Sequence, residues 1–192
     1  KTRIVCRSGS PLELADLEMV SLNSSRAVVI LSPGGEDADS LVIKTVLAVT
    51  NHPKRDTQHR LNIVAEIYDP HNMEVAQIIG NGEVEWIQVG EFVARVIAQT
   101  CRQSGLSVVY TEMLDFGGDE IYFHRQPELA GKTFGEALLM YPHNAVMGIT
   151  PQGGQPKLNP DPSTILNSGD ELIIMAADDD QIFYRPEDIC IQ

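Results

Sequence analysis

The sequence predicts an α/β fold in which a partial Rossmann-like parallel sheet, with its first strands missing, precedes a small α+β C-terminal lobe. From residue 1 to about residue 105, short β-branched runs alternate with helical segments, which indicates βαβ units with right-handed crossovers. Beyond a Gly117-Gly118 break, the pattern is richer in strands and more antiparallel in character. We therefore expect an N-terminal lobe over residues 1–116 and a C-terminal lobe over residues 117–192.

The first segment is expected to be a buried strand over residues 1–6, because an apolar run occupies residues 4–6. No cap or tail precedes this strand, so we expect the chain to be a piece of a longer protein. A turn leads to Pro11, which suits the first turn of a helix because its missing N–H costs nothing there. Leu14 and Leu17 then recur at helical spacing.

The next elements alternate between strand and helix. The run at residues 27–31 is apolar throughout and is typical of a strand buried on both faces of a parallel sheet. A Gly-rich acidic loop at residues 32–39 precedes an amphipathic helix, and Gly80 is a typical helix stop. The predicted strands are 27–31, 62–67 and 84–89, and the predicted helices are 41–49 and 73–79.

Two successive helices are expected at about residues 90–116, the first of them ending near Gly105. They carry more apolar surface than half a sheet needs, so we predict that they form an interface with a partner. The alternative is that both helices pack onto the sheet of their own lobe. The candidate interface residues are Phe92, Val96, Val109 and Met113.

The C-terminal lobe is expected to contain strands at residues 120–125 and 146–150, with a helix at residues 133–140 between them. A Gly/Pro-rich stretch at residues 151–162 leads to a final strand at residues 172–176. The second region is therefore expected to be small and rich in strands, and the sequence contains no long internal repeat.

The composition narrows the classes of function. The net charge is −13, from 27 acidic and 14 basic side chains, and a surface of this sign repels phosphate backbones and anionic lipid. We therefore expect no nucleic-acid partner. The three cysteines lack CxxC spacing, which argues against a disulfide framework or a zinc site and favours a reducing, cytosolic setting. Cys6 and Cys101 are expected to be buried in a strand and a helix.

The sequence offers no recognisable catalytic grouping, and we expect no enzyme. It contains no GxGxxG, HExxH, CxxC or GxSxG motif. Residues 32–35 follow a strand and precede a helix, as a phosphate-binding loop does, but their spacing is wrong and their acidic neighbours would repel a pyrophosphate. The histidines lie in loops or beside prolines and are interpreted as surface residues: His52, His59, His71, His124 and His143.

Two acidic runs carry the ligand types that hard cations prefer, since Ca²⁺ binds carboxylate and carbonyl oxygens from flexible loops. One consists of Glu36, Asp37 and Asp39, and the other is residues 178–180. Neither has the spacing of an EF-hand. The alternative is that both runs are exposed, solvated loops.

Several short segments, in order and spacing across nearly the whole chain, carry a resemblance to a known family. In the N-terminal lobe they are Arg7-Ser8-Gly9-Ser10-Pro11, Ala15-Asp16-Leu17 and Ser25-Arg26-Ala27-Val28-Val29-Ile30-Leu31. In the C-terminal lobe they are Leu129-Ala130-Gly131-Lys132-Thr133-Phe134, Gly148-Ile149, Leu158-Asn159-Pro160 and Gly169-Asp170-Glu171-Leu172. This set resembles the regulator of potassium conductance (RCK, TrkA-N/TrkA-C-like) domain, in particular that of CASTOR/POLLUX-type ion channels.

The resemblance implies a ligand-sensing gating domain of a cation (K⁺ or Ca²⁺) channel, on the cytoplasmic side of a membrane and without catalysis of its own. It also implies homo-oligomeric pairing through the helix–turn–helix at residues 90–116 and coupling to a pore domain in the same full-length chain. Measured against the family, the sequence begins at the third strand, so a nucleotide site on the first two strands would be incomplete.

The resemblance also bears on Ca²⁺, the candidate ligand. Some family members bind Ca²⁺ through carboxylates at positions that correspond here to Leu31, Glu66 and Tyr68, of which only Glu66 is acidic. Any Ca²⁺ site is therefore expected where loops meet at adjacent strand ends of the inferred sheet. The candidate ligands there are Glu66, Asp69, Glu36, Asp37 and Asp39.

Two alternatives to a channel domain stay open. One is a soluble Trk/Ktr-type nucleotide-binding regulator of potassium uptake, which would dock onto a separate transporter. The other is a truncated NAD-dependent oxidoreductase, which would need a GxGxxG motif upstream of residue 1.

Overall fold

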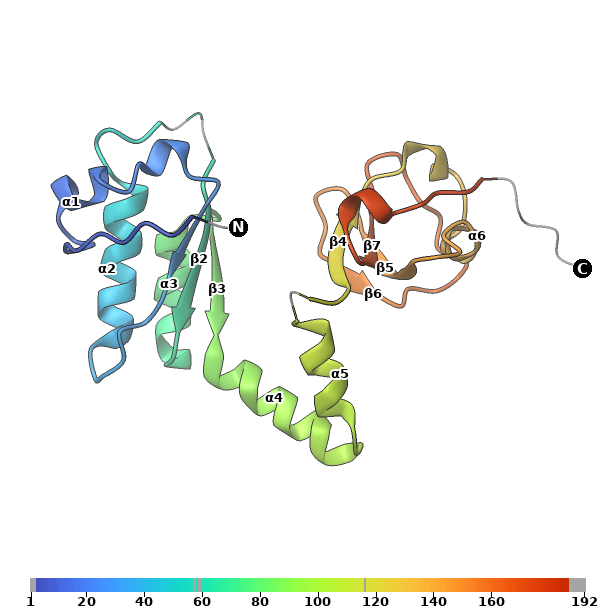
Figure 1. The fold of residues 1–192 in the computed structure, drawn as a ribbon, viewed down its shortest axis with the longest axis horizontal. Helices are drawn as coiled ribbons and strands as arrows, with labels where there is room; N and C mark the ends of the chain where they lie inside the picture. The colour runs from blue at the N-terminus through green and yellow to red at the C-terminus, as the bar shows by residue number, and fades with distance from the viewer. Residues whose placement is uncertain (1–2, 57, 59, 116, 187–192) are drawn as a thin grey trace, which may run out of the picture. The chain divides into compact units, whose positions relative to one another are not determined.

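The computed structural model describes residues 3–56, 58, 60–115 and 117–186 (Figure 1). The chain divides into two compact units, Lys1–Cys101 and Arg102–Gln192, each with its own sheet and hydrophobic core. The sequence pattern instead places the limit between the lobes at Gly117-Gly118, and that limit stays a prediction. Some predictions concern residues that lie outside the described ones, namely Lys1, His59, Phe116 and Cys190.

The first unit contains a parallel sheet in the order β1-β2-β3, with Ala27 paired to Asn62 and Ile63 paired to Val84. A helix lies in each crossover between consecutive strands, as the alternating pattern predicts. The elements are β1 (Ala27–Ile30), α2 (Ala38–Thr50), β2 (Asn62–Ile67), the short η2 (Pro70–Asn72), α3 (Met73–Gly80) and β3 (Val84–Gln88).

One face of this sheet is covered and the other is open. Ile63 of β2 is fully buried in a cluster with Val46 of α2, and Ile79 of α3 packs against the same cluster. On the opposite face, Val29 is 63% exposed and Ile87 is 45% exposed. The expectation that residues 27–31 are buried on both faces is therefore wrong, because α2 and α3 both pack on one side.

The segment before β1 differs from its prediction. Residues 3–8 form no strand, and Ile4 and Cys6 are exposed, because the three-stranded sheet places no strand beside this segment to pair with it. Pro11 lies in a turn closed by the Glu13 N–H and the Ser10 carbonyl (3.1 Å), so it precedes the helix instead of opening it. The helix is α1 (Leu14–Glu18), followed by η1 (Leu22–Ser24).

Both helices expected at residues 90–116 are present, as α4 (Val89–Arg102) and α5 (Leu106–Met113). Gly105 precedes α5 with a left-handed φ of 88°, a conformation that glycine adopts without steric cost. The prediction that Cys101 is buried is wrong, because α4 buries none of its residues.

The second unit contains an antiparallel sheet in the order β4-β7-β5-β6. Ile174 and Leu172 of β7 are buried with Phe134 and Tyr141 in the core beneath α6. Thr133 caps α6 by accepting from the Glu136 N–H (3.2 Å) while Glu136 accepts from the Thr133 N–H (2.7 Å). The elements are β4 (Glu120–His124), η3 (Pro127–Leu129), α6 (Phe134–Leu139), β5 (Ala145–Thr150), β6 (Lys157–Leu158), β7 (Glu171–Ala176) and η4 (Asp179–Gln181).

A parallel sheet with helical crossovers followed by a small antiparallel lobe confirms the predicted fold class. Strand β6 lies in the Gly/Pro-rich stretch at residues 151–162 and was not expected from the sequence. Within the part of the chain that the structure describes, no helix has both the length and the apolarity needed to cross a membrane.

Candidate functional site

Helix α4 carries an uncovered apolar stripe. Phe92 and Ile97 are 52% and 58% exposed, Val93 is also exposed, and Val96 is half-buried. These residues form pairs at i, i+4 and therefore share one side of the helix. A helix normally buries its apolar stripe, so this one is available to a partner. Phe92 and Val96 are predicted interface residues, and that role stays a prediction. Val93 and Ile97 were not among the predicted residues, although their spacing carries the same signal.

Helix α5 also buries none of its residues. Val108 and Val109 are 68% and 49% exposed. Met113 is half-buried and lines a cavity of about 200 Å³ with Met175 of the adjoining sheet, so it packs partly within its own unit. Among the predicted residues of α5, Val109 is therefore the more accessible one.

The first unit has an apolar groove along the free edge of its sheet. The groove has a volume of about 610 Å³ and runs between β1, α2 and the segment containing α1 and η1. β1 is the terminal strand in the sheet order, and Leu31, which follows it, is 69% exposed. An open edge beside apolar side chains is a surface on which further chain can pack.

The candidate cation ligands lie in different environments, and Asp39 is the buried one (7% exposed). Its carboxylate accepts from the backbone N–H groups of Tyr68 (3.0 Å) and Asp69 (2.9 Å). It also accepts from the Asn72 side-chain amide (2.9 Å). Burial raises the pKa of Asp39, but the Asn72 amide and these N–H groups outweigh burial and hold the pKa below its ordinary value. Asp39 thus fastens the start of α2 to the loop after β2.

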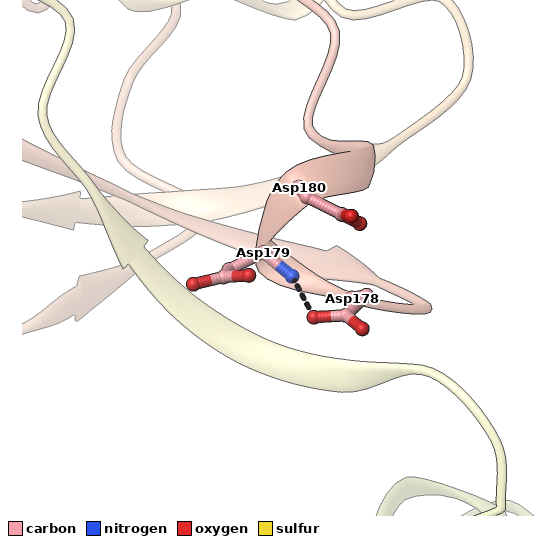
Figure 2. A group of neighbouring side chains, drawn as sticks. All are labelled: Asp178, Asp179 and Asp180. Carbon is pink, nitrogen blue, oxygen red and sulfur yellow. Dashed lines mark hydrogen bonds between the residues drawn. The ribbon is translucent and has the colours of Figure 1, made fainter.

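The other four candidates do not converge on one point. Glu66 accepts from the Ser32 N–H (2.6 Å), and Asp69 accepts from the His71 N–H (2.9 Å) and lies 2.8 Å from its Nδ1. Glu36 and Asp37 are exposed. Over residues 3–56, 58, 60–115 and 117–186, the group of three acidic side chains with mutually close ligand atoms is Asp178–Asp180, all exposed at the start of η4 (Figure 2). Ca²⁺ binding by the predicted five stays a prediction.

The Asp39 contacts predict an acid-sensitive link. Because the pKa of Asp39 is lower in the folded chain, its contribution is complete above the unfolded pKa and is lost as pH falls through the folded pKa. Asp39→Asn should therefore lower the free energy of unfolding most near neutral pH, and the difference from wild type should shrink as pH falls through the lowered pKa of Asp39. Urea unfolding followed by the fluorescence of Trp86 measures this difference; a gap that stays constant with pH would contradict the assignment.

The sequence of the chain matches one family model and several known proteins. Residues 90–192, more than half of the chain, match the family model "Castor and Pollux, part of voltage-gated ion channel". The chain is 37% identical over 183 residues to the "Probable ion channel CASTOR" of Oryza sativa subsp. japonica, and 36% identical to the "Ion channel CASTOR" of Lotus japonicus. These alignments cover 93% of the chain but only 20% and 21% of the relatives, so the chain spans about a fifth of their length.

Among solved structures, the human SLO3 gating ring superposes with a TM-score of 0.67 over 90% of this chain and 36% of that chain. The sequence identity is 21%, so this likeness shows a shared fold. The matches to both units of the chain agree with the resemblance derived from the short segments.

Proposed function

Because this chain belongs to the Castor and Pollux family, we propose that it is a ligand-sensing regulatory domain that gates an ion channel and has no catalysis of its own. The observation that carries the proposal is the apolar stripe of α4, which the domain leaves uncovered. A regulatory domain needs such a surface, because it acts by changing how it contacts other parts of an assembly. The relatives are named as ion channels, and the chain matches about a fifth of each.

The open sheet of the first unit supports a place within a longer chain. Parallel sheets are normally covered on both faces, whereas here one face and the β1 edge are uncovered. We expect other segments of the full-length protein to fill the groove of about 610 Å³ beside β1 and complete the sheet. The pore domain would then belong to the same chain, with this domain on the cytoplasmic side of the membrane.

The gating step follows from linkage between binding and conformation. A ligand that binds one arrangement of paired domains more tightly shifts the equilibrium toward that arrangement by its differential affinity. If two copies pair through α4 and α5, the element that switches between two states is the arrangement of the two copies relative to each other. The same scheme fits a soluble uptake regulator less well, because the relatives are named as channels.

Substitution of the α4 stripe tests the pairing. The variant Phe92→Glu/Val96→Glu places two charges on the apolar side of α4 and should weaken self-association by roughly tenfold or more. Ala98 is exposed on the opposite side of the same helix, so Ala98→Glu is the matched control. Sedimentation velocity over a range of concentrations measures both. If the folded double variant associates as strongly as the wild type, α4 does not form the pairing interface.

A further inference from the structure

Strand β4 forms an unprotected edge of the antiparallel sheet. In the order β4-β7-β5-β6, the described strands pair with β4 on one side only. The opposite edge is β6, which is two residues long, contains Lys157 and follows Pro156, all features that discourage edge-to-edge pairing. β4 has five residues with neither Pro nor Lys. Its free side therefore offers backbone donors and acceptors to another strand.

One face of this edge is apolar. Ile121 and Phe123 are 42% and 56% exposed, and they lie on the face of the sheet opposite Leu172 and Ile174, the β7 residues of the buried cluster. The intervening Tyr122 is half-buried and pairs with Ile174 of β7, which belongs to that core. A partner strand would cover two large side chains that the protein itself leaves in water.

The two ends of β4 carry charges of opposite sign. Its start is acidic: Asp119 and Glu120 lie there, and Asp178 and Asp179 are close enough to act on Tyr122. Loss of solvent, the Glu120 carboxylate and these two aspartates together raise the pKa of Tyr122 to about 12.

The end of β4 carries the opposite character, with His124 followed by Arg125. Arg125 forms an exposed ion pair with Glu171 (3.3 Å). An antiparallel copy of this strand, centred on Tyr122, would bring each acidic end against the basic end of its partner. Asp119 would face Arg125 of the second copy, and Ile121 would face its Phe123.

We propose that β4 pairs antiparallel with β4 of a second copy of this chain, about a two-fold axis at Tyr122, so that the two antiparallel sheets become one continuous sheet. Such a contact is isologous, which is the form that closed dimers take. Its apolar pairs bury Ile121 and Phe123, and its charge pairs fix the register. This surface is separate from the stripe on α4, and neither contact requires the other.

Charge reversal tests the register. The test uses the Phe92→Glu/Val96→Glu background, which removes the α4 stripe. In this background, Asp119→Arg places two positive charges opposite each other across the two-fold axis. Arg125→Asp places two negative charges opposite each other in the same way. Each variant alone should associate about tenfold more weakly than the background protein. An equimolar mixture of the two should regain association, because each introduced arginine would face an introduced aspartate. Sedimentation velocity measures all three samples, and circular dichroism checks that each variant is folded.

Crosslinking provides a second readout that does not depend on charge. Residues directly opposite each other on antiparallel strands have Cβ atoms about 4.5–5.5 Å apart, near the range that a disulfide needs. With the native cysteines replaced by serine, Tyr122→Cys should form a dimer under mild oxidation, whereas Leu138→Cys, on α6, should not. A mixture no more associated than its separate components, or equal crosslinking at both positions, would overturn the proposal. Complete loss of association in the Phe92→Glu/Val96→Glu background would also overturn it, because pairing through β4 should persist without the α4 stripe.

Discussion

Replacement of Ile174 by alanine is expected to lower the free energy of unfolding of the second unit by about 4 kcal/mol. Ile174 is fully buried in the middle of β7, where it pairs with Tyr122 of β4 on one side and Val146 of β5 on the other. Since strands flank it on both sides, the site cannot collapse around the smaller side chain. The substitution therefore loses both the transfer free energy of the side chain and the contacts around the cavity.

Urea unfolding followed by far-UV circular dichroism measures this loss. Trp86 is the single tryptophan and belongs to the first unit, so its fluorescence transition should stay in place. Ile165 is 63% exposed, and Ile165→Ala is the matched control, with an expected change of about 0.5 kcal/mol or less. Equal effects of the two substitutions would show that Ile174 is not at the centre of the core.

Replacement of Arg55 by alanine is expected to lower the free energy of unfolding of the first unit by about 3 kcal/mol. The Arg55 side chain is only 7% exposed, and its Nη2 lies 2.6 Å from Glu83, just before β3. Its Nη1 donates to the Thr50 carbonyl at the end of α2 (3.0 Å). Truncation removes both contacts and leaves the Glu83 carboxylate, which is 33% exposed, without its cation.

The fluorescence of Trp86 reports this change, because Trp86 packs against the core of the first unit. A double-mutant cycle with Glu83→Gln separates the pairwise energy from the loss of the Arg55 stem. Arg60→Ala is the control, since Arg60 is exposed and donates to a backbone carbonyl (2.8 Å). A loss in Arg55→Ala no larger than in Arg60→Ala would contradict a stabilising role for the partly buried Arg55–Glu83 pair.

The local pattern of apolar and turn-forming residues was enough to predict those strands and helices that depend on residues close together in the sequence. The apolar run of β2, the helix stop at Gly80 and both helices of residues 90–116 are present. The failures depend on contacts between distant residues. Residues 4–6 have the composition of a strand but no strand to pair with. The helix predicted to start at residue 41 begins at Ala38, and Asp39 in its first turn accepts from backbone N–H groups some 30 positions away.

The features of the candidate site also fall into those that local sequence could predict and those that it could not. The stripe on α4 could be predicted because helical spacing alone reveals it, and the structure leaves it exposed. The sequence could not show whether the five candidate carboxylates meet at one point, because their positions depend on the hydrogen bonds that each makes. Asp39 is fully engaged with backbone and amide donors, whereas Glu36 and Asp37 are exposed. The β4 edge carries no sequence signal, since its exposure depends on the order of strands in the sheet.

Ion flux through the full-length protein in liposomes tests most directly whether this domain gates a channel. The comparison is between the wild type, the Phe92→Glu/Val96→Glu variant and the Ala98→Glu control, each with the same amount of folded protein. A gating domain that acts through the α4 stripe predicts altered flux in the double variant and wild-type flux in the control. Identical flux in all three proteins would contradict the account.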